Sequence, residues 1–399
     1  MIDHTGPVER VGLRRWSASG RWAAAAFVAV LIGTVPACAT DRSEASVRSD
    51  GAGSASADVS STTARVPTAP ESTVAPTTTE APVSWPIATE AVAQMGDGVN
   101  FGSALEAPNE GDWGPPISDA TIGEVVAKGF HTVRLPVKWS GHAGTSDPFT
   151  IDAAFFGRVD TVIDSLLAQQ LIVIVDVHHD DEIMNDPGAE APRFLALWRQ
   201  ISVHYQGRSP NLWFELLNEP YGSVTGAVWN TLARDTLAAV RETNPKRIVV
   251  IGPVELNSAD HLAALDLPAD AYLMSTFHYY GPIEFTHAGA SWMPGSDKWI
   301  GRRWRGTDAD RAALREVMSQ AAQFRTDTGI PVFLGEFGVP GRPNAGDIGP
   351  WLQAMVCTAA SLDIPWIHWI YGGFDPTARR WDLVTLAGLR SVHDGQCPS

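Results

Sequence analysis

Two glutamates stand at the ends of apolar runs, where charged residues are uncommon. Glu219 lies in the stretch LLNEP (216–220), whose proline ends a strand, and Glu336 lies in FLGEFG (333–338) after another apolar run. A single glutamate in such a place is more often a salt-bridge partner. Two carboxyl groups that face each other across a cleft can serve as acid, base and nucleophile on a glycosidic bond. The pair is therefore our candidate catalytic centre.

Other polar and aromatic residues also stand where an apolar run should stop. They are Arg134, His178, His179, Asn218, His278, Tyr280 and Trp369. One such residue would mean little. A polar or aromatic residue at the end of one apolar run after another is hard to explain by packing alone. The neighbours His178 and His179 could suggest a metal site. Adjacent residues of a strand face opposite ways, however, so they rarely bind one ion, and we expect no metal and no other cofactor.

These residues need a scaffold, and the chain from residue 94 to residue 399 alternates between short β-rich runs and amphipathic stretches of helical period. The expected strands are 97–102, 131–136, 171–176, 212–217, 247–251, 271–277, 331–335 and 365–370. The expected helices include 118–128, 153–169, 190–206, 226–243, 308–327 and 347–361. This order predicts an α/β fold with a parallel sheet, closed most simply as a (β/α)8 TIM barrel. A doubly wound sheet is the alternative, but no G-x-G-x-x-G turn follows the first strand.

The motifs at these run ends resemble those of glycoside hydrolase family 5, the cellulase-type barrels of a larger retaining clan. The resemblance rests on LLNEP, FLGEFG, Arg134, His178 and the stretch HYY (278–280), and it extends from residue 94 to about residue 390. It implies that Glu219 is the acid/base and that Glu336 is the nucleophile. In a barrel of this kind, the carboxyl ends of the strands would bring the two together.

The same resemblance implies roles for neighbouring residues. Asn218 would bind the 2-hydroxyl of the sugar, and His178 and His278 would line the cleft. Trp369 would stack on the sugar in the −1 subsite.

Further stretches resemble one bacterial subgroup of endoglucanases, some of which also cut mannan. They are GVNFGSALEAPNEGDWG (98–114), HHDDEIMNDP (178–187) and EFTHAGASWMPGSDKWIG (284–301). This likeness implies that Glu106, His179 and Trp292 line the cleft. The chain departs from the family at Ser103, which stands where an asparagine is usual. A serine cannot present an amide to a sugar in the minus subsites.

The implied roles set requirements for the two carboxyl groups. The acid/base must hold a proton when the leaving oxygen departs, so the pKa of Glu219 should be raised. Glu336 must stay ionised, and Arg134 and Tyr280 would stabilise its charge through hydrogen bonds. Once Glu336 is esterified its charge is gone, and the pKa of Glu219 should fall, which suits its change from acid to base.

The N-terminal region differs from the rest of the chain. Residues 1–39 contain Arg14, Arg15 and Arg21 ahead of an apolar run (22–36), as in an export signal. A lipobox would end at Cys38, which would be lipidated and attach the protein to a membrane; an A-x-A site would be cut after Ala39. Residues 40–93 are rich in Ser, Thr, Pro and Ala and predict a disordered linker. The protein is therefore expected to be secreted or held at the cell surface.

The net charge and the cysteine content bear on the class of partner and on disulfide bonding. The net charge of -16 argues against nucleic acid as a partner, because binding to phosphate needs clustered lysine and arginine. Of the three cysteines, Cys38 is removed from the folded domain by either processing route. Cys357 and Cys397 are then expected to form a disulfide in an oxidising compartment.

The first hypothesis is a monomeric, metal-free endoglucanase that cuts a β-1,4-linked polysaccharide with retention. A β-mannanase, or an enzyme with mixed glucan and mannan specificity, is the alternative. Two other classes remain: a non-catalytic barrel that only binds glycan at the cell surface, and a metal-dependent barrel hydrolase.

Overall fold

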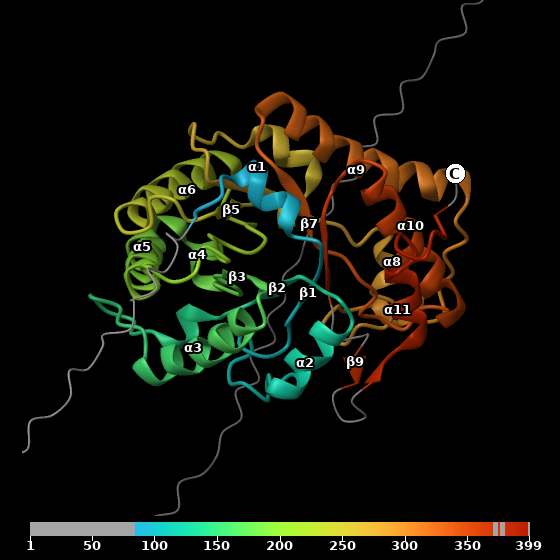
Figure 1. Cartoon of the computed structure of the whole chain (residues 1–399), viewed down its shortest axis with the longest axis horizontal. Coiled ribbons are helices and arrows are strands. Elements are labelled where there is room, and N and C mark those ends of the chain that lie inside the picture. The colour runs from blue at the N-terminus through green and yellow to red at the C-terminus, as the bar shows by residue number, and fades with distance from the viewer. Residues whose placement is uncertain (1–83, 370–373, 376–379, 398–399) are drawn as a thin grey trace, which may run out of the picture. The chain divides into compact units, whose positions relative to one another are not determined.

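The computed structural model describes residues 84–397, apart from 370–373 and 376–379. Within this part, eight parallel strands close into a barrel, and the first strand pairs with both the second and the last. The strands are β1 (Asp97–Asn100), β2 (Thr132–Leu135), β3 (Ile172–Asp176), β4 (Leu212–Glu215), β5 (Val249–Ile251), β6 (Leu273–His278), β7 (Val332–Glu336) and β8 (Trp366–Trp369). Figure 1 shows them at the centre with helices around them. The prediction of a TIM barrel is confirmed, and the doubly wound sheet is excluded.

The predicted helices all form, with ends shifted by a few residues. The larger helices are α2 (Asp119–Ala127), α3 (Ala153–Ala168), α5 (Pro187–His204), α6 (Gly226–Arg241), α9 (Asp308–Thr328) and α10 (Ile348–Ala360). Side chains of Ser118, Asp152 and Thr307 cap the first turns of α2, α3 and α9. Each accepts a hydrogen bond from a backbone N–H that the helix itself leaves free.

Several short elements were not predicted. They are α1 (Ala88–Ala91), α4 (Asp181–Asn185), α7 (Val254–Asn257), α8 (Ile283–Thr286), α11 (Leu383–Leu389) and the hairpin of β9 (Phe374–Asp375) and β10 (Arg380–Trp381). α4 and α8 lie between a strand and the next long helix, α7 lies between β5 and β6, and the hairpin and α11 follow β8. Helices of one turn have little periodicity, so the hydrophobic pattern does not reveal them.

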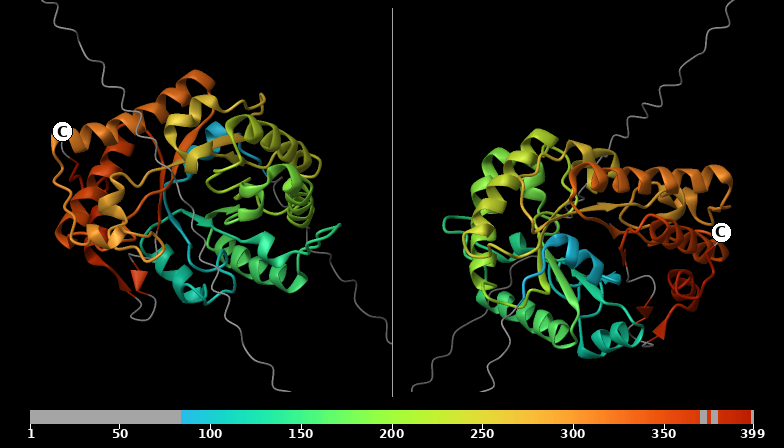
Figure 2. Two further views of the ribbon diagram at one scale, coloured as in Figure 1. Left: turned by 180° about the vertical axis from the view of Figure 1, so that it is seen from behind. Right: turned by 45° about the horizontal axis from the view of Figure 1, so that its top comes forward.

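The end of the barrel that lies next to α1 is filled by apolar side chains from alternate strand positions. They include Ile172, Ile174, Trp213, Val250, Met274, Phe333 and Ile367, with Ala88, Ala91 and Met95 of the N-terminal segment packed against them. In Figure 2 the segment that carries α1 lies close to the strands, inside the ring of longer helices. The sequence analysis placed residues 88–93 in the linker, but they are ordered because these apolar side chains close the barrel. Residues 40–83 of the predicted linker and the export signal lie outside the described residues.

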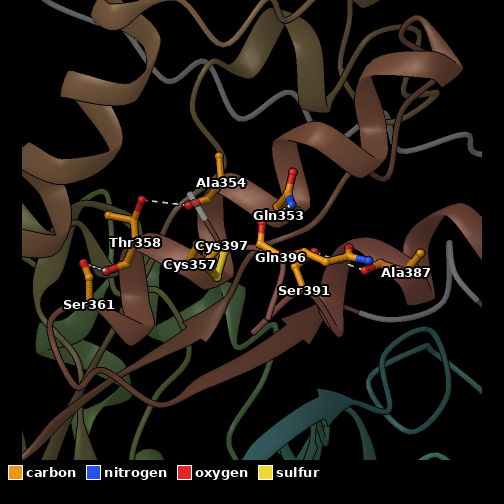
Figure 3. Close-up of a disulfide and its surroundings, with 9 residues drawn as sticks. All are labelled: Gln353, Ala354, Cys357, Thr358, Ser361, Ala387, Ser391, Gln396 and Cys397. Atoms are coloured by element: carbon orange, nitrogen blue, oxygen red, sulfur yellow. Dashed lines mark hydrogen bonds between the residues drawn. A yellow bond between two sulfur atoms is a disulfide. The ribbon is translucent and has the colours of Figure 1, made fainter. Parts of the chain in front are cut away.

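The C-terminal tail is held by a disulfide. Cys357 of α10 is bonded to Cys397, with Cα atoms 5.5 Å apart, as predicted (Figure 3). Beside it, Gln353 donates a hydrogen bond of 2.8 Å to the carbonyl oxygen of Gln396. Further back in the tail, the His393 ring lies 2.5 Å from the carboxylate of Asp97 in β1. The tail therefore joins the last long helix to the first strand.

Among the described helices, none combines the length and the hydropathy that a membrane span needs.

Candidate active site

A cleft of about 890 Å³ opens at the carboxyl ends of the barrel strands. Every site residue that the sequence predicted lines it, with one exception. The lining set includes Glu106, His178, His179, Asn218, Glu219, His278, Tyr280, Trp292, Glu336 and Trp369, together with Ser103, Trp113, Glu255 and Leu256. The exception is Arg134, which lies fully buried beneath the cleft floor.

Glu219 and Glu336 face each other in this cleft. A carboxylate oxygen of each, with a ring nitrogen of His278, forms a group in which all three atoms lie within 4.8 Å of one another. Retaining glycosidases hold their two carboxyl groups about 5–5.5 Å apart, whereas inverting enzymes need roughly 6.5–9.5 Å to admit a water molecule. This close approach of the two carboxyl groups fits a double displacement.

The backbone places the two carboxyl groups differently. Glu336 is the last residue of β7 and is 4% exposed. Glu219 lies beyond the end of β4, with a left-handed φ of 47°, and its side chain is 27% exposed. A non-glycine residue in that conformation costs about 1–2 kcal/mol, which the surrounding contacts must offset. The turn places Glu219 in the cleft wall while Glu336 stays at its floor.

Arg134 connects the nucleophile candidate to the barrel interior. Its Nη1 donates to Glu336 Oε1 at 2.7 Å, and its Nε and Nη2 donate to the two oxygens of Glu215 at 2.7 and 2.8 Å. Nη2 also lies 2.7 Å from Asp176 Oδ2. Burial by itself disfavours the cation, but Glu215, Asp176 and Glu336 together raise the pKa of Arg134 well above its usual range. One buried cation thus faces three carboxyl groups.

Sequence analysis missed two of these carboxyl groups, Asp176 and Glu215. Both are fully buried, and they pair with each other in the register of β3 and β4. The alternation of strand residues could have found them. Ile174 fills the barrel interior, so Asp176, two residues further on, points the same way. A carboxylate at an interior position of an apolar strand requires a buried cation as partner.

Asp176 also orients a histidine at the cleft. Its Oδ2 lies 2.7 Å from Nδ1 of His178, and burial holds the pKa of that imidazole well below its usual range. The ring is therefore neutral, and the proton it carries sits on Nδ1, facing the carboxylate. Nε2 is left with a lone pair for a ligand in the cleft.

Glu336 has a hydrogen-bond donor for each oxygen. The hydroxyl of Tyr280 donates to Oε2 at 2.9 Å, while Arg134 holds Oε1. Nδ1 of His278 lies 2.8 Å from Glu219 Oε1 and 3.7 Å from Glu336 Oε2. Each carboxyl group of the pair is thus fixed by at least one side chain from a different strand or loop.

Burial dominates the acidity of both carboxyl groups. It raises the pKa of Glu219 to about 7, and it also raises the pKa of Glu336 to about 7, although His278, Arg134 and Tyr280 oppose the rise at Glu336. We expected the raised pKa of Glu219 and not that of Glu336. Two carboxyl groups this close hold a single proton between them near neutral pH. Because Arg134 and Tyr280 stabilise the charge on Glu336, the proton resides on Glu219.

The two adjacent histidines correct one of our arguments. We expected His178 and His179 to face opposite ways as neighbours on a strand. β3 ends at Asp176, however, and His179 has a left-handed φ of 51°, so both rings line the cleft, 4.5 Å apart. Burial lowers the pKa of His179 to about 3, which leaves this ring neutral as well.

Aromatic side chains line the cleft at three places. Trp369 lies almost parallel to the ring of His178, with centroids 6.0 Å apart. Gly102 makes room for it, because a Cβ there would lie 2.7 Å from the indole. Trp292 and Trp113 are 63% and 53% exposed, and they belong to loops that follow β6 and β1. Sequence analysis named Trp292 and Trp369 but missed Trp113, although it lies in the stretch 98–114 that carried the resemblance.

Glu106 lines the cleft, but its carboxylate is engaged with the backbone. One oxygen accepts a hydrogen bond of 2.9 Å from the N–H of Ala104, and the other accepts one from Ser103. Burial raises the pKa of Glu106 to about 7. The side chain therefore fixes the loop after β1, in which Ser103 has a left-handed φ of 63°.

Among the described residues, Glu219, His278 and Glu336 form a group close enough to hold a metal ion. Their hydrogen bonds fit a metal poorly. Both oxygens of Glu336 already accept from Arg134 and Tyr280. Nδ1 of His278 faces Glu219, where it carries a proton and is therefore not a ligand. That the enzyme needs no metal remains a prediction.

Comparisons with known proteins point to one family. The family model described as Cellulase (glycosyl hydrolase family 5) matches residues 92–375. Endoglucanase H of Acetivibrio thermocellus is 35% identical over 289 residues, which cover 72% of this chain and 31% of that protein. Endoglucanase 1 of Ruminococcus albus is 29% identical over 308 residues, which cover 71% of this chain and 73% of that one. This chain thus spans about a third of the length of the first relative.

Solved structures of related proteins point to the same family. Cel5A of Thermotoga maritima in complex with mannotriose superposes with a TM-score of 0.74 at 36% identity, covering 76% of this chain and 99% of that one. The same protein in complex with cellobiose gives the same TM-score, identity and coverage.

Proposed function

This chain belongs to glycosyl hydrolase family 5, and we propose that it cuts β-1,4-linked glucan chains internally, with retention of anomeric configuration. The observation that carries the proposal is the pairing of Glu219 with Glu336, which each place one carboxylate oxygen within 4.8 Å of the other's. Their environments differ in the way that a double displacement needs. Glu336 is held as the anion by Arg134 and Tyr280, and Glu219 holds the shared proton.

In the first step a carboxylate oxygen of Glu336 attacks the anomeric carbon. Glu219 gives its proton to the glycosidic oxygen, the bond between that oxygen and the anomeric carbon breaks, and the leaving chain departs as an alcohol. The product is a glycosyl ester of Glu336. Glu219 is now a carboxylate, and its pKa falls because the charge of Glu336 has been neutralised.

In the second step Glu219 acts as the base. It takes a proton from water while the water oxygen attacks the anomeric carbon, and the ester bond to Glu336 breaks. Both carboxyl groups return to their starting states. Two displacements at one carbon restore the original configuration.

Neighbouring side chains would hold the sugar. Oδ1 of Asn218 accepts a hydrogen bond of 2.8 Å from Arg134, which directs the Nδ2 donors of that amide away from the arginine and toward a sugar hydroxyl. Nε2 of His178 is available as an acceptor. The indole of Trp369 offers a face on which a sugar ring can stack. Trp113 and Trp292, on loops after β1 and β6, would extend the contact to sugars further along the chain.

A neutral polysaccharide suits this cleft. The ionisable groups at its floor are paired with each other or uncharged through burial, the exposed Glu255 stands in its wall, and most of its remaining surface is aromatic and apolar. A β-mannanase activity is the second candidate, favoured by the mannotriose complex of the related Thermotoga maritima protein. Glucose and mannose units differ only at C2, so one cleft can admit both.

Hydrolysis of carboxymethylcellulose, lichenan and glucomannan tests the proposal. We expect viscosity to fall faster than reducing ends appear, and proton NMR to show the retained anomer first. Activity should survive a chelator. The inverted anomer as first product would contradict the mechanism, and no hydrolysis of any of the three would favour a barrel that only binds glycan.

We also propose that the protein is exported, because basic residues and an apolar run precede the Ser/Thr/Pro-rich segment. Labelling with palmitate would separate a lipoprotein anchored through Cys38 from an enzyme released by cleavage after Ala39. An intact N-terminus recovered from cytoplasm would contradict both routes.

A further inference from the structure

The segment after β5 has an unusual backbone. Glu255, Leu256 and Asn257 follow one another with left-handed φ values of 57°, 62° and 55°. Each such non-glycine residue costs about 1–2 kcal/mol, and asparagine is among the residue types that tolerate the conformation best. Leu256 is 46% exposed in the cleft wall, whereas Asn257 is fully buried beneath it. Strain of this kind persists only where surrounding contacts fix it.

Asn257 contacts the histidine between the two catalytic carboxyl groups. Its Nδ2 lies 3.2 Å from Nε2 of His278. The backbone supports this contact, because Ser258 forms a parallel bridge with His278 at the end of β6. Gly252 also makes room for the amide, since a Cβ there would collide with the Asn257 side chain.

The position of His278 determines which of its nitrogens carries the proton. Burial lowers the pKa of His278, so the ring is neutral and has one N–H. Nδ1 faces Glu219 Oε1 at 2.8 Å and Glu336 Oε2 at 3.7 Å. The anionic Glu336 beside Nδ1 disfavours a lone pair there, and a proton on Nε2 would face the Nδ2–H donors of Asn257, so Nδ1 carries the proton and Nε2 has the lone pair. A buried lone pair needs a donor, and Asn257 supplies it.

We propose that Asn257 is a positioning residue that fixes the Nδ1–H tautomer of His278 and thereby keeps a hydrogen-bond donor on Glu219. The inference rests on the proposed function, in which Glu219 is the acid/base. A donor that stays on Oε1 throughout the reaction stabilises the carboxylate form of Glu219. It therefore helps the first step, in which Glu219 releases its proton, and it keeps Oε1 occupied while the other oxygen exchanges protons with the leaving group and with water.

The other titratable and charged groups around this pair come from the neighbouring strands and loops. They are Glu336, Arg134, Glu215, Asp176, Tyr280 and His178. Of these groups, Glu336 lies on the Nδ1 side of the His278 ring, 3.7 Å away, whereas the hydrogen bond at Nε2 comes from Asn257. A change at Asn257 therefore alters the Nε2 side of the ring and leaves these groups in place.

Two substitutions should move the acidity of Glu219 in opposite directions. Asn257→Gly keeps the left-handed backbone without strain and removes the donor, so the hydrogen bond to Glu219 weakens and its pKa rises. Asn257→Asp places a carboxylate beside Nε2, so the ring gains a second proton. The imidazolium next to Glu219 then lowers its pKa. The alkaline limb of kcat/KM against pH should move up in the first variant and down in the second, by about one pH unit each.

The Gly variant should also lose roughly tenfold in kcat/KM on polysaccharide near its optimum. Gln170→Gly is the matched control, because Gln170 is exposed, lies far along the chain from the site and has a similar φ of 62°. Its pH profile should match that of the parent enzyme. Shifts of the same sign in both Asn257 variants, or no shift in either, would overturn the proposal.

Nitrogen-15 NMR of the imidazoles tests the tautomer without any substrate. The parent protein should show His278 protonated at Nδ1 alone, with its signals assigned by their loss in His278→Gln, and Asn257→Gly should show a mixture. A proton on Nε2 in the parent protein would overturn the proposal even if the enzyme is active. Failure to hydrolyse any glycan would overturn the proposed function instead, and NMR would still report the tautomer. If Asn257→Asp does not fold, the Gly variant and the NMR result decide.

Discussion

Arg134 donates a 2.7 Å hydrogen bond to Glu336 while it also pairs with Glu215 and Asp176, so one buried side chain neutralises the catalytic anion and holds together the top of the barrel core. Stability and activity therefore depend on the same guanidinium. Removing one partner of a buried ion pair is far more damaging than removing a surface pair, because the remaining charges cannot reach water.

Arg134→Met should therefore lose about 3–5 kcal/mol of unfolding free energy in urea at neutral pH, together with nearly all activity. The loss of stability should shrink as the pH falls, because protonation relieves the unpaired carboxyl groups of Asp176, Glu215 and Glu336. Arg158→Met is the control. Arg158 binds Glu110 with two short bonds, but its side chain is 31% exposed, and its loss should cost about 1 kcal/mol or less. Equal losses of unfolding free energy in the two variants would contradict the conclusion that the buried ion pairs of Arg134 stabilise the barrel more than a partly exposed pair does.

The two catalytic carboxyl groups should give opposite signatures with azide. Glu336→Ala should abolish turnover, and azide should restore it by attacking from the vacated side, which gives a product of inverted configuration. Glu219→Ala should still accept a substrate with a good leaving group and then stall, and azide should release a product of retained configuration. Proton NMR of the glycosyl azides decides. A retained product from Glu336→Ala would show that the nucleophile has been assigned wrongly.

The dependence of kcat/KM on pH should be bell-shaped. The proton shared by the pair must be present for the first step, and the pKa of Glu219 is raised to about 7, so activity should fall as the pH rises through that region. At low pH a second proton neutralises Glu336, and activity should fall again. Glu219→Gln should lose the alkaline limb on an aryl glycoside whose leaving group needs no acid. If the alkaline limb persists in this variant, the ionisation that lowers activity at high pH belongs to a group other than Glu219.

The disulfide should matter for stability and not for catalysis. Cys357 and Cys397 are 40 residues apart in sequence, and a loop of that size is worth about 3–4 kcal/mol under the chain-entropy model. Cys357→Ser with Cys397→Ser should lower the urea midpoint and leave kcat unchanged below the transition. A fall in kcat at full folding would show that the tail also shapes the cleft.

Trp113 should contribute to binding of long substrates. Trp113→Ala should raise KM on polysaccharide roughly two- to tenfold and leave kcat on a short aryl glycoside unchanged, because the exposed indole supplies stacking and takes no part in the chemistry. Val203→Ala, at another exposed apolar side chain outside the cleft, should change neither value. An equal effect on the short substrate would place Trp113 at the reacting sugar.

The barrel and the carboxyl pair could be predicted because six of the eight strands end in, or carry, a residue type that packing does not explain. Glu219, Glu336 and Tyr280 lie in the short motifs LLNEP, FLGEFG and HYY, which can be recognised in the sequence. Asp176 and Glu215 could have been found from the alternation of interior positions in β3 and β4.

Other features depend on tertiary contacts that no local pattern reports. The left-handed turn at Glu255–Asn257 places an amide against His278, a residue 21 positions further along the chain. Local preference disfavours three such residues in a row, so the turn could not be predicted. The same holds for His179, whose orientation follows from the end of β3 at Asp176.

The closure of the barrel has a consequence for biosynthesis. β1 pairs with β8, and the tail then bridges β1 and α10 through His393 and Cys397. A ribosome delivers β1 first and the tail last, so one edge of β1 has no partner until nearly the whole chain has been made. An exposed strand edge invites pairing with other chains. The growing polypeptide therefore depends on whatever shields that edge during synthesis, and a premature stop before β8 should yield a product that aggregates instead of a smaller active enzyme.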